Sequence, residues 1–498
     1  MTPPHTTLSA ARLSRAQHVA LVAAVVLCRV LATRSCPIYD DAFITYRYAR
    51  NLAEGAGLVY NPGAPWEPVL GTTTPFYALV LAGLAKLGAT LTVASIALNV
   101  VLDAITAILL PRLLGFARAS STFAVLSFAA LPYIARISVG GMESPLFALC
   151  GVGAVLALSA ESAVLAGLLA AIACIVRPEG VLLCAILFAS RLRKPRELVR
   201  FTLPVLAVGV VSVVVLSSIY GSPIPQSVLA KATMHDKTNE WPETISRWKA
   251  VLSQSFAPTL ALLPLVPLIL FGAWRAIQTG GALRAFSLWA LGISASYFLA
   301  RTHTWGWYFY VPLLGWSLWF GIGVQCVLAW MAPRIPAGIA RISNAFGPQS
   351  LAALAVAATA VVSTLKPTLV DKNVYAPMQA WAEATSKREP GARILASDIG
   401  AIGWHWKGTV LDSEGLVWPE ALRYKLPNPI IEHEKPEYLM VVLEQPRLKH
   451  LLSRPDLFAL YTPVARFSVR GATKLDPKVE EIEPLWSQDY LVLKRRAP

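Results

Sequence analysis

Apolar runs separated by short polar stretches fill the first three quarters of the chain. His18–Thr33 is the first run, and eleven more follow at roughly 74–88, 92–112, 119–137, 145–160, 162–176, 178–190, 199–219, 255–274, 284–300, 307–330 and 349–366. A helix needs about 20 apolar residues to cross a bilayer, and repeated runs of this kind are typical of polytopic membrane proteins. The pattern predicts such a protein, in which the shorter runs are tilted or belong to longer helices.

The basic residues indicate which runs cross. The chain carries a net charge of +15, and Lys and Arg favour the cytoplasmic side of membrane proteins. If the run 74–88 lies along the outer surface, the basic loops, including the cluster Arg191–Arg200, fall inside. This choice predicts about 11 spans, with the polar motifs and the C-terminal tail outside. We therefore expect a multi-pass protein of the cytoplasmic membrane whose polar motifs, the candidates for a functional site, are extracytoplasmic.

The composition changes near Lys366, where charged residues return and apolar runs shorten. Val374–Ser386 has a helical pattern, and short β-branched and aromatic segments indicate strands. These strands are Arg393–Ala396, Val410–Asp412, Tyr438–Val442 and Tyr490–Leu493. About 130 residues suffice for one small domain. The predicted domains are a transmembrane module at 1–367, with a first external loop at 34–91, and an α/β domain at 368–498.

Other classes of protein fit this sequence less well. The six cysteines lie almost all inside apolar runs, which is typical of buried thiols rather than of disulfides or a zinc cluster. No domain carries the basic stripe that nucleic-acid binding needs, so no nucleic-acid partner is expected. The sequence contains no P-loop, no dinucleotide fingerprint and no nucleophile elbow.

The first loop opens with a pair of carboxylates, Asp40 and Asp41, followed by a helical segment rich in Arg and Tyr, including Arg47. Either aspartate can N-cap that helix, because an Asp side chain accepts from free amides of a first turn. Carboxylates at a membrane surface also act as general bases or as metal ligands. Both interpretations remain open from the residues alone.

Two further acidic motifs interrupt apolar runs. Glu143 either caps the helix that follows it or faces Asp40 and Asp41 across an external cavity, where the three would bind Mg, Mn or Ca or orient an acceptor hydroxyl. The motif Arg177-Pro178-Glu179-Gly180 contains two charged residues. Either Arg177 and Glu179 form an ion pair in a tight turn, or they face a cavity, because charged residues within a span are costly.

Cationic and aromatic residues follow in later loops. Lys231 binds an anionic head group or remains a solvated lysine. Arg301 and His303 precede an aromatic cluster. The cluster is either an interfacial belt or a surface where cations hold a lipid phosphate and rings stack on a sugar. The aromatic residues concerned are Trp305, Trp307 and Tyr308.

These motifs together resemble the GT-C superfamily of polytopic membrane glycosyltransferases, and within it bacterial members similar to mycobacterial arabinofuranosyltransferases. The matching segments are Asp40–Gly55, Gly141–Phe147, Arg177–Gly180, Tyr220–Pro225 and Asp398–Gly403. The run Trp66–Pro75 departs from the pattern of that family, and the tail is smaller. The resemblance predicts a GT-C-like α-helical fold with juxtamembrane helices in the first external loop.

The resemblance also implies a function. It predicts an inverting glycosyltransferase that moves arabinofuranose, or another pentose or hexose, from a polyprenyl-phosphate donor to a glycan, lipid or protein acceptor in the cell envelope. Asp40 or Asp41 would be the general base, with Glu143 and Glu179 as auxiliary acidic groups. No nucleotide is expected, because the donor carries the sugar on a lipid. The residues expected to hold the donor phosphate are Arg47, Arg177, Lys231, Arg301 and His303.

Two other functions are kept as hypotheses. A transporter or flippase for a lipid-linked saccharide would have inverted repeats and ionisable residues at mid-bilayer. A non-catalytic membrane protein would bind cell-wall glycan through its tail. The polar motifs gather on one predicted face of the membrane, which favours surface chemistry over transport.

Overall fold

A computed structural model describes residues 11–234, 241–242, 244–246, 248–249, 265–301, 304–332, 347–365, 374–424, 428–442, 450–467 and 489–496. The chain forms two compact units, which we call the helical unit and the mixed unit. The helical unit comprises Met1–Cys36, Ile96–Gly209 and Glu240–Pro367. The mixed unit comprises Pro37–Ser95, Val210–Asn239 and Thr368–Pro498.

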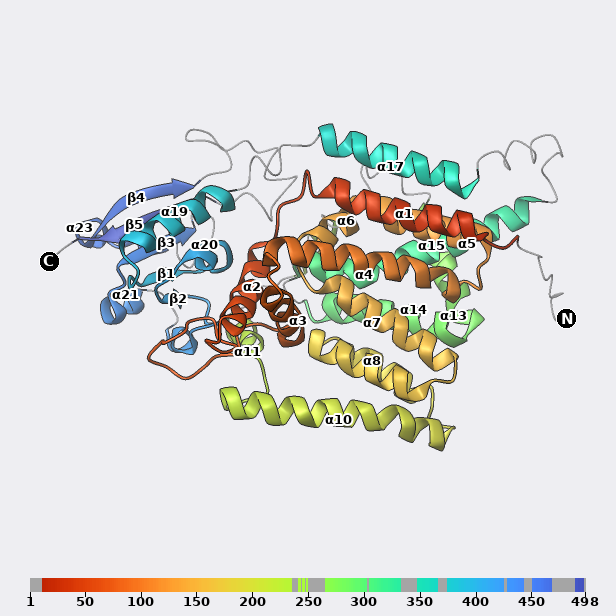
Figure 1. Ribbon diagram of the computed structural model, residues 1–498, viewed down its shortest axis with the longest axis horizontal. Helices are drawn as coiled ribbons and strands as arrows, with labels where there is room; N and C mark the ends of the chain where they lie inside the picture. Colours follow the sequence, from red (N-terminus) through yellow and green to blue (C-terminus); the bar gives the residue numbers. More distant parts are fainter. Residues whose placement is uncertain are drawn as a thin grey trace. The chain divides into compact units, whose positions relative to one another are not determined.

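The helical unit is built from long apolar helices, of which α1, α4, α7 and α8 run in roughly the same direction (Figure 1). Helix α4 begins in the mixed unit, and helix α10 ends in it. The elements are α1 (Arg15–Ala32), α4 (Leu91–Leu113), α5 (Arg118–Ala130), α6 (Pro132–Val139), α7 (Ser144–Ser159), α8 (Ala163–Val176), α9 (Gly180–Ala189), α10 (Pro195–Tyr220), α13 (Leu265–Thr279), α14 (Gly281–Leu299), η1 (Gly306–Phe309), α15 (Tyr310–Met331) and α17 (Pro348–Leu365).

Five helices in the described part of the chain are long and apolar enough to cross a membrane. They are α1, α4, α10, α14 and the continuous segment Gly306–Met331. The pair α5 and α6 passes the same test but is bent by 59°, and further apolar helices have 10–17 residues. The predicted class of polytopic helical membrane protein is confirmed. The apolar run 74–88 forms α3 (Pro75–Lys86), whose 12 residues are too few to cross a bilayer.

Glycines allow some of these helices to pack closely. A Cβ atom on Gly272 of α13 would lie 1.9 Å from the carbonyl oxygen of Trp319, and one on Gly323 of α15 would lie 2.3 Å from the carbonyl oxygen of Leu268. Small residues at such crossings let two backbones approach within a membrane. The Gly and Ala content of these helices therefore serves packing as well as hydropathy.

The mixed unit combines segments of the first loop with the tail. Its helices are α2 (Asp40–Ala53), α3, α11 (Gln226–Met234), α19 (Tyr375–Arg388), α20 (Gly400–His405), η3 (Pro419–Arg423), α21 (Asn428–Glu434), η4 (His450–Ser453) and α23 (Leu457–Leu460). Its strands are β1 (Ile394–Ala396), β2 (Val410–Asp412), β3 (Tyr438–Val442), β4 (Tyr461–Phe467) and β5 (Tyr490–Arg495). The four predicted strands are β1, β2, β3 and β5, and β4 was not expected.

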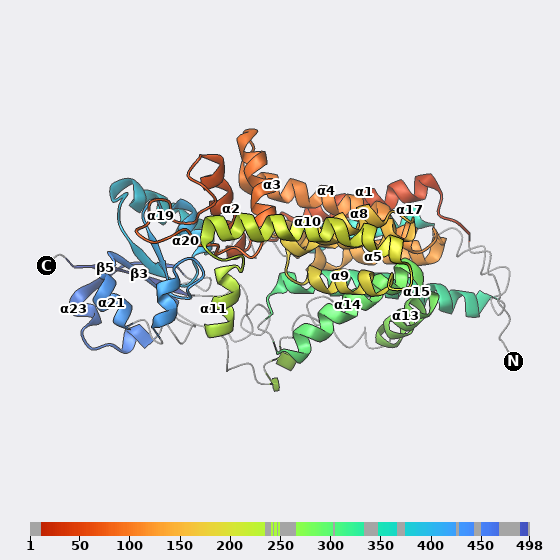
Figure 2. The ribbon, with the colours of Figure 1, turned by 90° about the horizontal axis from the view of Figure 1, so that it is seen from below.

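The five strands form one mixed sheet in the order β2-β1-β3-β5-β4. Strand β1 pairs in parallel with β2 and β3, whereas β5 pairs antiparallel with β3 and β4. Tyr438 packs beneath Trp381 of α19, while Leu439 belongs to a core that includes residues of α21 and α23. Successive strand residues point to opposite faces, so helices cover both sides of the sheet, as Figure 2 shows for α19 and α21.

Candidate active site

The acidic pair begins helix α2 in the mixed unit, but neither aspartate is its N-cap. Tyr39 occupies the N-cap position, and no side chain caps the helix. The carboxylate of Asp40 instead accepts hydrogen bonds from the backbone N–H groups of Gly400, at 2.9 Å, and Ala401, at 2.7 Å. These amides begin α20. The predicted capping of α2 is therefore wrong, because the Asp40 carboxylate accepts from free amides of α20, a helix in the tail.

Glycine in the tail motif makes this contact sterically feasible. A Cβ atom on Gly400 would lie 1.8 Å from the carbonyl oxygen of Asp40, and one on Gly403 would lie 1.8 Å from the hydroxyl of Tyr60. No side chain fits at such a distance. The spacing of glycines in Asp398–Gly403 is thus explained by the close approach of the first loop to α20 within the mixed unit.

The environment of Asp40 disfavours its ionised form. Burial and the negative charge of Asp398 raise the pKa of Asp40 to about 8, with a smaller contribution from Asp41, although the amides of Ala401 and Gly400 act against the shift. Asp398 accepts a hydrogen bond from the Tyr490 hydroxyl at 2.6 Å. The tail thus brings a third carboxylate to the pair. Asp398 was part of a quoted motif but was not predicted as a site residue.

Arg47 links α2 to the tail within the same unit. Its Nε donates to the carbonyl of Tyr60 at 2.7 Å, and its Nη1 donates to the carbonyl of Gly403. Its guanidinium also lies 4.4 Å from the centre of the Tyr60 ring. The side chain is buried. Because these contacts use donors that a phosphate would need, they disfavour the predicted role of Arg47 in binding the donor phosphate.

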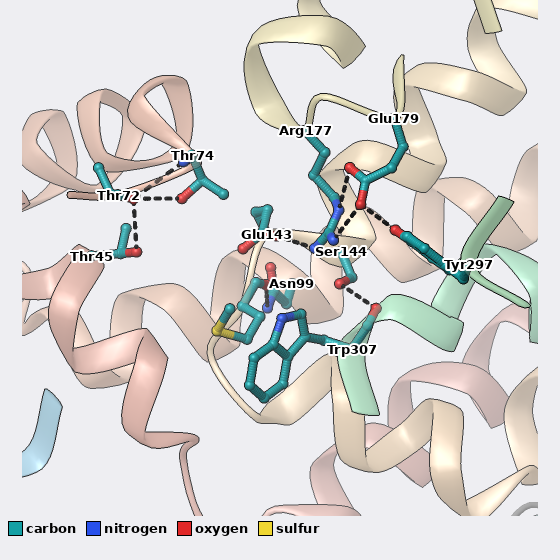
Figure 3. Close-up of polar contacts among 11 residues, drawn as sticks. Thr45, Thr72, Thr74, Asn99, Glu143, Ser144, Arg177, Glu179, Tyr297 and Trp307 are labelled. Carbon is teal, nitrogen blue, oxygen red and sulfur yellow. Dashed lines mark hydrogen bonds and ion pairs between the residues drawn. The ribbon is translucent and has the colours of Figure 1, made fainter. Parts of the chain in front are cut away.

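Hydroxyl groups fix the end of the first loop. Thr45 of α2 and Thr72 lie 3.4 Å apart at their Oγ1 atoms, and Thr72 is 3.1 Å from the hydroxyl of Thr74 (Figure 3). All three are buried. This chain holds the residues before α3 against α2, so the run Trp66–Pro75 is an ordered part of the mixed unit.

A second charged cluster lies in the helical unit, where Arg177 sits between two glutamates (Figure 3). Its Nη1 donates to Oε1 of Glu143, and its Nη2 donates to Oε1 of Glu179 at 2.8 Å. The Tyr297 hydroxyl also donates to Glu179. Glu143 occupies the N-cap position of α7, as one interpretation predicted, but its side chain makes no capping hydrogen bond. Arg177 and Glu179 form the pair that the turn interpretation predicted, with Glu143 added.

One carboxylate oxygen in this cluster has no assigned partner. The Oε2 atom of Glu143 is buried and has no hydrogen-bond partner among the residues that the structure describes. A buried, unsatisfied carboxylate oxygen is costly. If both glutamates are ionised, the cluster of Glu143, Arg177 and Glu179 carries one net negative charge, which favours a hydroxyl or a cation over a phosphate.

The predicted aromatic surface adjoins this cluster. The guanidinium of Arg177 lies 4.8 Å from the Tyr308 ring centre, and Tyr308 stacks on Tyr297 with centres 5.2 Å apart. Trp305 and Trp307 are parallel, with centres 5.8 Å apart. Trp307 is buried and Trp305 is partly exposed. Trp305 therefore presents the more accessible ring of that pair.

Two polar residues of α4 position the loop that carries Glu143. The Asn99 amide donates to the carbonyls of Ser138, at 2.9 Å, and Met142, at 2.8 Å. Asp103, one helical turn later, accepts from the Ser138 hydroxyl at 2.6 Å. Residues four apart share one helix face, so α4 holds both the end of α6 and the loop. Sequence reasoning missed these residues, although polar side chains inside an apolar run were a visible signal.

Asp103 is also ion-paired with Arg29, and both side chains are fully buried. Arg29 donates to the carbonyls of Phe128, at 2.8 Å, and Ala129, at 2.9 Å. Residue 132 is a proline without an N–H, so the Phe128 carbonyl cannot make its usual helical bond. Arg29 therefore satisfies carbonyls freed where α5 bends into α6.

The remaining predicted cations are less defined. His303 and the side chain of Lys231 lie outside the described residues. Arg301 is exposed, and its guanidinium lies 5.7 Å from the Trp241 ring centre. No group of three or more His, Cys, Asp or Glu side chains in the described ranges is arranged to hold a metal ion. The divalent cation stays a prediction.

Comparison with known proteins identifies the fold. Residues 368–489 match a family described as a domain of unknown function, DUF8728, and no curated protein matches the sequence. The crystal structure of ArnT from Cupriavidus metallidurans bound to undecaprenyl phosphate aligns with a TM-score of 0.57 and 12% identity, covering 95% of this chain and 97% of that chain. The chain has the fold of ArnT. The apo structure of ArnT gives a TM-score of 0.55, with the same identity and coverage.

Proposed function

We propose that this protein is an inverting GT-C glycosyltransferase that transfers a sugar from a polyprenyl-phosphate donor to an acceptor at the external membrane face. The observation that carries the proposal is the ArnT fold over 95% of the chain, since that relative was crystallised with undecaprenyl phosphate. The acceptor is a glycan, lipid or protein of the cell envelope. Arabinofuranose is one candidate sugar, among other pentoses and hexoses.

Asp41 is the proposed general base. Asp40 already accepts two backbone hydrogen bonds, and a pKa near 8 keeps it largely protonated at neutral pH. Asp41 takes the proton of the acceptor hydroxyl as that oxygen bonds to the anomeric carbon. The bond from this carbon to the phosphate oxygen breaks, and the lipid phosphate leaves with the bonding electrons. Attack opposite to the leaving group inverts the anomeric centre.

Glu143 is the proposed acceptor-orienting group. Its Oε2 atom has no hydrogen-bond partner among the described residues, and a sugar hydroxyl would satisfy it. Arg177 and Glu179 hold Glu143 in place, and the partly exposed ring of Trp305 offers a stacking surface. For the donor phosphate we propose Arg301, which is exposed, together with Lys231 and His303. A divalent cation bound to carboxylates would assist the same charge separation.

The test compares Asp41→Asn with Asp40→Asn in a deletion strain of the source organism. Mass spectrometry of the cell-envelope glycans should show a species that the deletion removes and the wild-type gene restores. Asp41→Asn should fail to restore it, because loss of a general base costs about 10²–10⁴-fold in rate. Asp40→Asn should restore it in part.

Protein level in the membrane, measured by immunoblot, controls for folding. An unchanged glycan profile in the deletion strain would contradict the proposed transferase. Full restoration by Asp41→Asn would instead overturn the assignment of the base. Accumulation of a lipid-linked saccharide on the inner leaflet, without any transferase activity in isolated membranes, would favour the flippase hypothesis.

A further inference from the structure

A pocket of about 250 Å³ lies entirely within the mixed unit. Three segments that are distant in sequence form it: the end of the first loop, the residues around the end of α10 and the start of α11, and the tail just before and within η3. It is somewhat smaller than typical ligand pockets of roughly 300–1,000 Å³, so it suits a single ring or a short ligand. Its principal lining residues are Trp66, Glu67, Tyr220, Gln226, Trp418 and Glu420.

Aromatic rings form firm walls of this pocket. Trp418 is buried in the core beneath the sheet, and Trp66 packs against it with ring centres 6.4 Å apart at an angle of 45°. The Tyr220 hydroxyl donates to the carbonyl of Leu58 at 2.6 Å, which fixes that ring as well. Trp66 is only half-buried. Rigid aromatic side chains supply contact area at a low cost in conformational entropy.

The polar lining consists of carboxylate, amide and hydroxyl groups. Glu67 and Glu420 contribute negative charge, and the described residues that line the pocket include no Lys, Arg or His. A phosphate or carboxylate ligand would therefore be repelled. Gln226 donates from Nε2 to the carbonyl of Gly415 at 3.2 Å, which orients its amide. Glu420 pairs with exposed Arg423 at 2.8 Å.

Such a lining matches the chemistry of a sugar. The C–H face of a pyranose or furanose ring packs on an indole, while its hydroxyls donate to carboxylates and exchange hydrogen bonds with an amide. A lipid chain would make no hydrogen bond with the carboxylates of Glu67 and Glu420 or with the Gln226 amide. An anionic head group would meet like charges.

We propose that this pocket binds an uncharged sugar residue of a glycan, as a site separate from the residues that carry the transfer chemistry. The assignment of that glycan as the acceptor rests on the proposed function, whereas sugar binding itself does not. The segment Trp66–Pro75 is the part of the first loop that departs from the family pattern. Trp66 and Glu67 belong to this segment and line the pocket, so the sugar-binding surface is a feature of this chain rather than of the family pattern.

The test measures binding without any donor. Full-length protein in lipid nanodiscs is titrated with neutral trisaccharides built from arabinose, xylose, mannose, glucose or galactose, and binding is followed by saturation-transfer NMR and calorimetry. We expect at least one trisaccharide to bind. Trp66→Ala should weaken that binding about tenfold, the change expected for one lost aromatic contact, and Glu67→Gln should also weaken it.

Trp381→Phe is the matched control, because Trp381 lies in the same unit and stacks on Trp406 outside the pocket lining. Its affinity should equal that of the wild type. Absence of binding by every trisaccharide at about 10 mM, or equal affinity in Trp66→Ala and wild type, overturns the inference. Stronger binding of a single-chain lipid than of any sugar overturns it too.

The outcomes separate this inference from the proposed function. If transfer in cells persists and no sugar binds, only the pocket assignment falls. If sugar binds and Trp66→Ala weakens it while the deletion strain has normal glycans, the transferase proposal falls and the glycan-binding hypothesis takes its place.

Discussion

At the scale of single residues, Asp40 makes the stability of the mixed unit depend on pH. Its pKa in the folded protein is about 8, whereas a free aspartate has a pKa of about 3.9. The folded state therefore holds the proton more tightly than the unfolded state. This contribution to stability is fully present below about pH 4 and is lost as the pH rises through about 8. We expect the unfolding temperature, followed by tryptophan fluorescence, to fall over that range.

Asp412 offers a matched comparison in the same unit. Burial raises the pKa of Asp412 to about 7, against hydrogen bonds from the amides of Glu414, Val417 and Leu416. Asp412→Asn should remove the part of the fall in unfolding temperature that ends near pH 7. Asp40→Asn should remove the part that extends to about pH 8. A pH dependence that is identical in wild type and both variants would contradict the assigned environments.

Gly400 provides a steric prediction at the same scale. An alanine there would place its Cβ 1.8 Å from the Asp40 carbonyl oxygen, so α20 and α2 would have to separate. We expect Gly400→Ala to lower the free energy of unfolding by about 1–3 kcal/mol, measured by denaturant titration of the purified protein.

Gly391 is the control for that substitution. It is exposed, and a Cβ atom there would meet no atom within 4 Å. Gly391→Ala should change stability little. Equal stability of the two alanine variants would rule out the close contact between α2 and α20.

The sequence indicated several site residues but few of their contacts. Glu143, Arg177 and Glu179 were recognised because ionisable residues are rare in apolar runs, and the structure joins them. The contacts of Arg47 could not be predicted, because its partners include the carbonyl of Gly403, a backbone atom that no residue pattern reveals. The contacts of Asp40 could not be predicted for the same reason, since the amides that it binds lie in the tail.

At the scale of elements, the bend between α5 and α6 depends on a buried ion pair. Asp103→Ala would leave the fully buried Arg29 without its carboxylate and would remove an acceptor of the Ser138 and Tyr310 hydroxyls. Breaking a buried pair costs about 3–5 kcal/mol. We expect a lower unfolding temperature in detergent, and reduced transfer as well, because the same helix holds the loop that carries Glu143.

Thr106→Val is the control in the same helix. Thr106 is buried, and its hydroxyl has no hydrogen-bond partner among the described residues. Its loss should leave the unfolding temperature unchanged or raise it. The double variant Arg29→Met with Asp103→Leu should recover part of the stability lost in Asp103→Ala. Greater damage from Thr106→Val than from Asp103→Ala would contradict the proposed role of the ion pair.

The Arg29–Asp103 pair also bears on the transporter hypothesis, which predicted ionisable residues inside the membrane. These two are bound to each other, to helix carbonyls and to the hydroxyls of Ser138 and Tyr310. A proton or ion relay needs groups that exchange partners. The arrangement fits a fixed helix junction better than a transport path.

Elements with a regular pattern were predictable, and those set by pairing were not. The helix at Val374–Ser386 is α19, and four strands of the sheet were identified from their composition. Strand β4 was missed because Thr462–Arg466 is partly exposed and contains Pro463, which weakens a strand signal. Pro463 is tolerated because β4 lies at the edge of the sheet.

At the scale of the whole molecule, the chain order conceals the composition of the mixed unit. The composition change near Lys366 was visible, but Pro37–Ser95 and Val210–Asn239 also belong to this unit. Hydrophobic periodicity reports on neighbours in sequence, whereas this grouping depends on contacts such as that of Gln226 with Gly415. The pocket proposed to bind a sugar, which we call the carbohydrate pocket, is lined by all three segments. It could therefore not be predicted from the sequence.

The membrane orientation is the last prediction, and α10 gives it a physical basis. This helix has 26 residues, a length of about 39 Å, which exceeds the hydrocarbon thickness of about 30 Å. Its first turn follows the basic cluster Arg191–Lys194, and its last residues belong to the mixed unit. Basic loops favour the cytoplasm, so the segment after Tyr220 should be extracytoplasmic.

Reporter fusions test that orientation. Alkaline phosphatase fused after Pro498 should be active, because it folds only outside the cytoplasm, and green fluorescent protein at the same position should be dark. Fusions after Arg193, in the basic loop, should give the opposite pair of results. A fluorescent, phosphatase-negative C-terminus would place the acidic pair and the carbohydrate pocket in the cytoplasm, where the proposed external transfer cannot occur.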